Sequence, residues 1–233
     1  MDRKPILTVL TGAGMSAESG LATFRDSDGL WAKYKIEEVC TPEALRANPA
    51  LVIDFYNMRR RECAKAQPNE AHRLLAELEK DYDVRIVTQN VDDLHERAGS
   101  TNVIHLHGEL FKCASMANPY RPLPLPDGRI EMTVEDKDAD GYMLRPFIVF
   151  FGEQVPRLED GAREVQRADI FLIIGTSLNV YPASGLIHYT KSDTPIFLID
   201  PNDVHAGSKV HYIKAGASEG MKKFVEILKD LKL

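Results

Sequence analysis

The chain has no long hydrophobic run and only three cysteines among its 233 residues. No apolar stretch approaches the roughly 20 residues that a bilayer-spanning helix needs, and residues 1–10 lack the pattern of a signal peptide. Cys40, Cys63 and Cys113 are far apart and form no CxxC pair, which favours a reducing compartment. We therefore expect a cytoplasmic protein that has no membrane partner.

An excess of positive charge is also missing. The net charge is −6 and the isoelectric point is about 5.7. A protein of this balance carries no global basic field that would recruit nucleic acid or anionic lipid, so we expect no nucleic-acid partner. A hydrophobic content of 44% over 233 residues is enough for the core of one large domain with a small appendage.

A glycine-rich turn follows the first apolar run, residues 6–10. Gly12, Gly14 and Gly20 fall within nine residues of one another. Glycine lets a ligand approach the backbone closely, and the N–H groups of a following helix favour an anion. The spacing matches neither the dinucleotide fingerprint nor a P-loop, which would need Gly-Lys-Ser/Thr. Taken alone, this segment fits a tight turn as well as it fits a pyrophosphate site.

Three further polar clusters come directly after β-branched runs. They span residues 88–99, 105–109 and 175–183, and the runs before them span residues 84–87, 103–104 and 170–174. Open α/β sheets bind their ligands at the carboxyl ends of the strands. The sequence therefore predicts a single ligand site that is built from several strand ends.

The alternation of strands and helices predicts a doubly wound parallel, Rossmann-like α/β sheet. Helices are expected near 69–80, capped by Asn69, and near 218–231, beginning at Ser218. Residues 31–63 (helical) and 111–144 (loop-rich) interrupt the alternation and predict a second, smaller domain built from two insertions. The large domain would then comprise about 1–30, 64–110 and 145–233. Strands are expected near 5–10, 84–88, 103–106, 147–150, 170–175, 195–199 and 210–213.

The four motifs, in this order, closely resemble the sirtuins, the NAD-dependent protein lysine deacylases. The matching segments run from Thr11 to about Ala217, which is nearly the whole chain. The resemblance implies NAD as co-substrate and acyl-lysine proteins or peptides as partners, and we expect a monomer. In this family the acyl-lysine carbonyl oxygen attacks the nicotinamide ribose, and nicotinamide leaves. The products are free lysine, nicotinamide and O-acyl-ADP-ribose.

His107 is the first candidate for chemistry, because a neutral imidazole is the natural base near pH 7. Judged from the residues alone, His107 could instead pack or form a hydrogen bond, as most histidines do, or ligate a metal together with His105 on the same strand face. The resemblance implies that His107 is the base that activates the ribose hydroxyls and that His105 is structural. It also places Asn90 at the reacting face.

The resemblance implies an extended NAD site. Gln89 would contact a ribose, Asn90 and Asp92 the nicotinamide, Arg25 the phosphates, and Phe24 would shield the reactive sugar from water. For the polar residues the alternative is ordinary loop capping. Ala22 stands where the family usually has proline. The full expected set is Gly12, Ala13, Gly14, Ser16, Ala22, Phe24, Arg25, Trp31, Gln89, Asn90, Val91, Asp92, Gly175, Thr176, Ser177, Asp200, Pro201, Asn202 and Ala217.

Two segments match those between which sirtuins hold a substrate peptide as an added strand. They contribute Phe151, Gly152 and Glu153 on one side, and Val180 and Tyr181 on the other. Backbone pairing of this kind predicts loose sequence selectivity.

The helix expected after Asn48 and Pro49 carries Tyr56 and Arg59 on one face. In one sirtuin class this Tyr-x-x-Arg pair binds the distal carboxylate of succinyl- or malonyl-lysine. The alternative is a solvated basic face over residues 59–61. Cys40 aligns where that class often has a small residue that widens the pocket. Both acidic and plain acyl groups would then fit in the pocket.

One departure from the family concerns zinc. Many sirtuins hold a structural zinc with four cysteines in the small domain, and here that region offers only Cys113. One thiolate cannot replace four, so we predict no family-type zinc. The excursion over 111–144 would then depend on its prolines and on the packing of Phe111, Tyr120 and Tyr142. A zinc held by Cys113 with His or Asp ligands is the remaining alternative.

Three functions fit these observations. The first is an NAD-dependent deacylase that removes succinyl and malonyl groups and, more weakly, acetyl groups from protein lysines. The second is a protein ADP-ribosyltransferase that uses the same NAD cleavage. The third is a non-catalytic NAD-binding reader of acylated proteins. The combination of His107, Asn90, Tyr56 and Arg59 favours the first.

Overall fold

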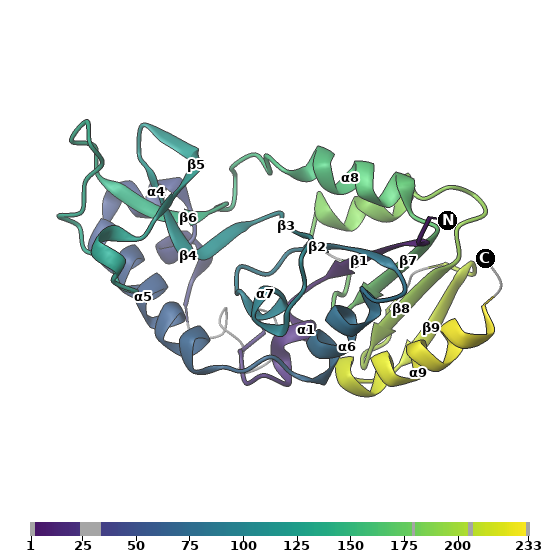
Figure 1. Cartoon of the computed structure of the whole chain (residues 1–233). Coiled ribbons are helices and arrows are strands. Elements are labelled where there is room, and N and C mark those ends of the chain that lie inside the picture. Colours follow the sequence, from purple (N-terminus) through teal and green to yellow (C-terminus); the bar gives the residue numbers. More distant parts are fainter. Residues whose placement is uncertain (1–2, 24–33, 179, 205–206, 232–233) are drawn as a thin grey trace.

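The computed structural model describes residues 3–23, 34–178, 180–204 and 207–231. Its main sheet has six parallel strands in the order β3-β2-β1-β7-β8-β9, at the right of Figure 1. Winding proceeds outward in both directions from the neighbouring strands β1 and β7, as expected for a doubly wound sheet. The predicted fold class is confirmed. The strands are β1 (Ile6–Thr11), β2 (Asp83–Thr88), β3 (Val103–His105), β7 (Ile170–Ile174), β8 (Ile196–Asp200) and β9 (Val210–Lys214).

Helices cover both faces of this sheet because successive side chains of a strand point to opposite sides. On β1, Leu7 and Val9 are fully buried with α6 (Glu70–Leu78) and α9 (Ala217–Asp230). Leu10 is buried on the opposite side with α8 (Leu158–Arg167) and the 3-10 helix η2 (Ala183–Tyr189). Figure 1 shows α6 and α9 on one side of the sheet and α8 on the other.

The expected helix caps are largely present. Asn69 caps α6 through the backbone N–H groups of Ala71 and His72. Asn48 caps the long helix α5 (Pro49–Lys65) by accepting from Leu51 N at 3.1 Å, with Pro49 in the first turn. The last helix begins at Ala217, one residue earlier than predicted, and its cap residue Gly216 contributes no side chain.

The smaller part of the molecule pairs helices with a three-stranded antiparallel sheet, at the left of Figure 1. The sheet has the order β5-β4-β6, with β4 (Gly108–Ser115), β5 (Asn118–Pro124) and β6 (Leu144–Ile148). Around it lie α3 (Ile36–Val39), α4 (Pro42–Ala47), α5 and the short 3-10 helix η1 (Pro126–Gly128). Two further short helices, α1 (Gly14–Ala17) and α7 (Leu94–Ala98), lie beside the main sheet.

Two expectations for this region were wrong. Residues 111–144 were expected to be loop-rich, but they contain most of β4 and all of β5. The prolines are tolerated because β5 is an edge strand, where a missing N–H costs little. The strand expected near 147–150 is β6, and it pairs antiparallel with β4 instead of joining the parallel series. The boundaries of the two domains stay a prediction.

A buried arginine organises the small part. Arg60 is completely buried on α5 and donates from Nε to Leu110 O at 2.8 Å and from Nη1 to Asn57 Oδ1 at 2.9 Å. The Asn57 side chain in turn pairs with both backbone polar groups of Met132. Burial lowers the pKa of Arg60 to about 10. These bonds attach α5 to β4 and to the 130s loop.

The expected aromatic packing is therefore only partly correct. Phe111 is partly buried, but Tyr120 and Tyr142 are 46% and 54% exposed. Instead, Ile53, Cys113, Met132 and Leu144 form a small apolar cluster next to Arg60. Cys113 is itself buried, and its thiol donates to Pro124 O at 3.0 Å.

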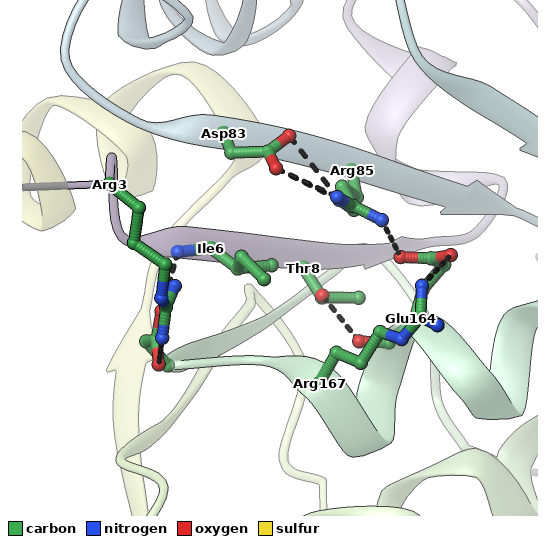
Figure 2. A network of polar contacts seen from close by, with 8 residues as sticks. Arg3, Ile6, Thr8, Asp83, Arg85, Glu164 and Arg167 are labelled. Carbon is green, nitrogen blue, oxygen red and sulfur yellow. Dashed lines mark hydrogen bonds and ion pairs between the residues drawn. The ribbon is translucent and has the colours of Figure 1, made fainter.

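A network of ion pairs connects residues near the amino ends of the main-sheet strands to one another and to α8. Arg85 on β2 contacts Asp83 at 2.8 Å and Glu164 of α8 at 2.5 Å, and Arg3 contacts Asp169 at 2.6 Å (Figure 2). This network lies at the opposite end of the strands from the clusters that follow their carboxyl ends. No helix in the described residues is long and apolar enough to cross a bilayer.

Replacing Arg60 tests its role in the small part. Arg60→Met removes charge-assisted hydrogen bonds from a buried site, so we expect a loss of about 1–3 kcal/mol in the free energy of unfolding. Arg61→Met, on the neighbouring residue, breaks only a half-exposed pair with Glu131 at 2.9 Å and should cost below about 1 kcal/mol. Urea unfolding followed by circular dichroism measures both. Equal losses would contradict the assignment of Arg60.

Candidate active site

A cavity of about 500 Å³ opens at the carboxyl ends of the main-sheet strands. Residues that follow β1, β2, β7 and β8 line it, together with side chains of α5 and of the segment after β6. All four motifs singled out from the sequence contribute to its wall. Its volume lies within the range of small-molecule sites.

The turns after β1 and β7 meet backbone to backbone in this cavity. Gly14 N donates to Gly175 O at 2.9 Å. A Cβ on Gly12 would lie 2.7 Å from Gly175 O, and one on Gly175, whose φ is +62°, would lie 2.3 Å from Met15 N. No larger residue fits at either position. The N–H groups of Gly12, Gly14, Met15 and Ser16 donate to carbonyl oxygens within the protein. The expected role of this turn in binding an anion stays a prediction.

His107 lies between β3 and β4, half-buried in the wall of the cavity. Its Nδ1 is 3.1 Å from Gln89 O. Because a carbonyl oxygen only accepts, Nδ1 carries the proton and Nε2 holds the lone pair. Burial lowers the pKa of His107 from its ordinary 6.5, against the smaller opposing effect of that hydrogen bond. The imidazole is therefore neutral and basic at pH 7.

His105 differs from His107 although both come from the same segment. Its Nδ1 lies 2.9 Å from Asn90 O and its Nε2 lies 2.8 Å from Glu96 Oε1. Burial alone would lower its pKa, but the hydrogen bond and charge of Glu96 outweigh burial, so the pKa of His105 is raised. Both ring nitrogens of His105 have protein partners, which is consistent with the structural role expected for this residue.

Asn90 is at the centre of a buried hydrogen-bond network. Its side-chain amide donates to Gly12 O at 3.0 Å and to Ser16 Oγ at 3.2 Å. Ser16 in turn donates to Asp92 Oδ2 at 3.0 Å. Burial raises the pKa of Asp92. Asn90 lines the cavity beside Gln89 and Val91, whereas Ser16 and Asp92 lie behind it.

The far end of the cavity is formed by β7, β8 and the start of α9. Thr176 Oγ1 accepts from Gln89 Nε2 at 3.2 Å, and Asp200 Oδ1 accepts from Asn202 N at 2.9 Å. Glu18 bridges from the glycine-rich turn to α9, because its carboxylate accepts from Ser218 N at 3.1 Å. The wall here includes Ala13, Gly14, Gly175, Thr176, Ser177, Asp200, Pro201, Asn202 and Ala217.

At the other end, α5 presents Tyr56 and Arg59 to the cavity. They are only 4% and 7% exposed, so the alternative of a solvated basic face is wrong for Arg59. The Tyr56 hydroxyl donates to Cys40 Sγ at 3.2 Å. Burial raises the pKa of Tyr56 well above its ordinary value and lowers that of Arg59. The wall therefore offers a neutral phenol beside a guanidinium.

The expected peptide segments lie on the rim. Phe151 and Tyr181 are 43% and 83% exposed, and both line the cavity with Gly152 and Val180. Glu153 also lines it, but its carboxylate turns inward to Arg145 at 2.6 Å. Its role in the structure is to hold the segment, which its sequence position did not reveal.

Some expected residues remain untested. Phe24, Arg25 and Trp31 lie outside the described residues. Ala22 is described and exposed, and it lies outside the cavity wall. Sequence reasoning missed Phe150 and Glu18, which line the cavity without a polar cluster or family signature to mark them. Within the described ranges, no group of three or more His, Cys, Asp or Glu side chains could hold a metal ion.

Comparisons with known proteins identify the relatives of this chain. Residues 12–182 match the Sir2 family. An NAD-dependent protein deacylase of Bacteroides thetaiotaomicron is 54% identical over 227 residues, which cover 95% of this chain and 97% of the relative. A mutant Sir2 homologue in complex with ADP ribose has a TM-score of 0.88 at 39% identity, covering 99% of this chain and 96% of that one.

A third comparison concerns a peptide complex. Sir2Tm bound to a propionylated peptide has a TM-score of 0.80 at 27% identity, covering 97% of this chain and 94% of that one. The family match spans most of the chain, and the relatives are similar along nearly their whole length. The chain therefore belongs to the Sir2 family.

Proposed function

We propose that this protein removes succinyl and malonyl groups, and more weakly acetyl groups, from protein lysines with NAD as co-substrate. NAD-dependent protein deacylation is the activity in the names of its curated relatives, and NAD is the co-substrate of the family. The preference for acidic acyl groups rests on one observation. Tyr56 and Arg59 are buried in the wall of the same cavity that holds His107 and Asn90.

The polar groups and the exposed backbone along the cavity fit a dinucleotide. Asp200, next to Asn202, supplies the acidic group that suits ribose hydroxyls at a strand end. The tight contact of Gly12 with Gly175 leaves backbone in place of side chains where a pyrophosphate would pass. When bound, NAD supplies the ribose carbon that accepts the acyl oxygen and the nicotinamide that leaves.

His107 would act as the general base on a ribose hydroxyl. The Gln89 carbonyl holds Nδ1–H, which leaves Nε2 to take the proton. Asn90 is fixed by Gly12 and Ser16, so it can orient substrate without moving. Asp92 would act through Ser16, and its contact with nicotinamide stays a prediction.

The end of the cavity that Tyr56 and Arg59 line favours an acyl group with a carboxylate, for electrostatic reasons. Arg59 is buried, with Glu62 Oε2 3.9 Å from its Nε, and an anionic acyl tail would add charge-assisted hydrogen bonds to the same guanidinium. The Tyr56 hydroxyl is a second donor, at present bonded to Cys40. A thiol is a weak acceptor, so a carboxylate competes well for the phenol proton. A plain acetyl group gains neither contact.

The competing functions differ in their products. Incubation with NAD and a succinylated peptide gives free lysine and O-acyl-ADP-ribose from a deacylase. An ADP-ribosyltransferase gives ADP-ribosylated protein, and a reader leaves both reactants unchanged. Mass spectrometry of one reaction separates the three, and we expect the first result.

Replacing Arg59 tests the acyl preference. On one peptide carrying acetyl, malonyl or succinyl on the same lysine, Arg59→Met should lower kcat/KM for the acidic groups by roughly 10- to 150-fold, because it removes charged hydrogen bonds. Activity on the acetyl peptide should change by less than about threefold. Arg61→Met, on the same helix but half-exposed, is the matched control. Equal losses on all three acyl groups would remove the claim of acid selectivity.

Two measurements test His107. His107→Ala should lower kcat by roughly 10²- to 10⁴-fold, because the base is lost. In the wild type, protonation of His107 stops catalysis, so activity falls as the pH falls through its pKa. Because burial lowers that pKa, the acid limb of the kcat profile should lie below pH 6.5. An unchanged rate in the variant, or an acid limb above pH 7, would refute the assignment.

A further inference from the structure

The segment from Val149 to Glu153 contacts three separate parts of the site. Val149 N donates to His107 O at 2.9 Å, and Phe151 N donates to Cys40 O at 3.0 Å. The ring of Phe150 stacks on Tyr56, with centroids 5.8 Å apart and an interplanar angle of 20°. The conformation of this segment therefore fixes the base, the acyl pocket and the peptide rim relative to one another.

A buried ion pair connects the end of this segment, Glu153, to Arg145 on β6. Arg145 Nη1 and Nη2 donate to the two Glu153 carboxylate oxygens at 2.6 and 3.0 Å. The two side chains are only 5% and 12% exposed. Glu153 Oε2 also accepts from Phe150 N at 2.7 Å, and Arg145 Nη2 donates to Ile148 O at 3.0 Å. The pair thus holds both ends of the turn.

The same guanidinium also forms one side of a stack. Arg145 Cζ lies 4.2 Å from the centroid of the Phe150 ring, and the same ring stacks on Tyr56. A planar guanidinium can make two parallel hydrogen bonds and stack on an aromatic face at once, which an ammonium cannot. The order of contacts runs from Glu153 through Arg145 and Phe150 to Tyr56, and Tyr56 ends on Cys40.

The net free energy of a buried ion pair suggests a role in geometry more than in stability. A buried ion pair contributes little to net stability, because the desolvation of both charges offsets their attraction, and in some proteins such a pair instead specifies one geometry. Here the ion pair fixes the conformation of the turn that contains Phe151 and Gly152, and both residues line the cavity. The nucleotide end, at Asp200 and Ala217, is built from other strands.

We propose that the Arg145–Glu153 ion pair is a positioning device for the acylated peptide. It holds residues 149–153 so that the acyl pocket and the peptide rim keep their place relative to His107. Neither residue acts on the reacting atoms. The identity of the ligand, an acyl-lysine peptide, rests on the proposed function. The consequence is a separation of effects, in which losing the pair weakens peptide binding and leaves NAD binding intact.

Glu153→Gln tests this separation, since it keeps the size of the side chain and removes its charge. With an acetylated peptide and NAD, we expect the KM for peptide to rise roughly 10- to 100-fold through misplacement of the rim, while the KM for NAD stays within about twofold. Glu164→Gln is the matched control. It weakens the partly buried Arg85–Glu164 pair (Figure 2). Neither residue of this pair lines the cavity. Both KM values should stay near wild type in the control.

Several outcomes would overturn the proposal. They are an unchanged peptide KM in Glu153→Gln, a parallel rise of the KM for NAD, or the same rise in the control. If Glu153→Gln unfolds at the assay temperature, Arg145→Lys decides instead, because it keeps the charge but lacks the planar fork. Its peptide KM should rise in the same selective way, and an unchanged value would refute the proposal. Absence of turnover in the wild type would instead contradict the proposed function.

Discussion

The site depends on a close backbone contact between two neighbouring parallel strands. β1 and β7 are neighbouring parallel strands, so the turns that follow them lie side by side at the same edge of the sheet. Only glycine permits the contact of Gly12 with Gly175 at the observed distance. The turn after β1 then reaches Asn90, whose amide donates to Gly12 O, so this contact aligns the turn after β2 as well.

From this edge the molecule makes two different environments in one cavity. The main sheet contributes the polar strand ends, with a neutral His107 held by Gln89. The small part contributes a largely apolar wall in which the buried guanidinium of Arg59 lies beside the phenol of Tyr56. In our proposal, cleavage of NAD belongs to the first environment and the choice of acyl group to the second. The segment 149–153 connects them through His107 O and Cys40 O.

Much of this could be predicted from the sequence. The apolar runs over 6–10 and 170–174 predicted two strands that the structure contains, and the polar residues expected after them line the cavity. The strands within residues 111–144 could not be predicted, because prolines in an edge strand look like a loop until the neighbouring strand is known. The Arg145–Glu153 pair and the Tyr56–Cys40 bond were also missed, since tertiary packing decides which partners buried side chains find.

The central claim is that one cavity places an acidic acyl tail beside Arg59 while His107 faces the ribose. A crystal structure of the protein with a succinyl-lysine peptide and an unreactive NAD analogue tests it most directly. We predict that the succinyl carboxylate accepts hydrogen bonds from Arg59 and Tyr56, with the Tyr56–Cys40 bond broken, and that His107 Nε2 points to the ribose hydroxyls. A succinyl carboxylate in solvent, or His107 turned away from the ribose, would contradict the account.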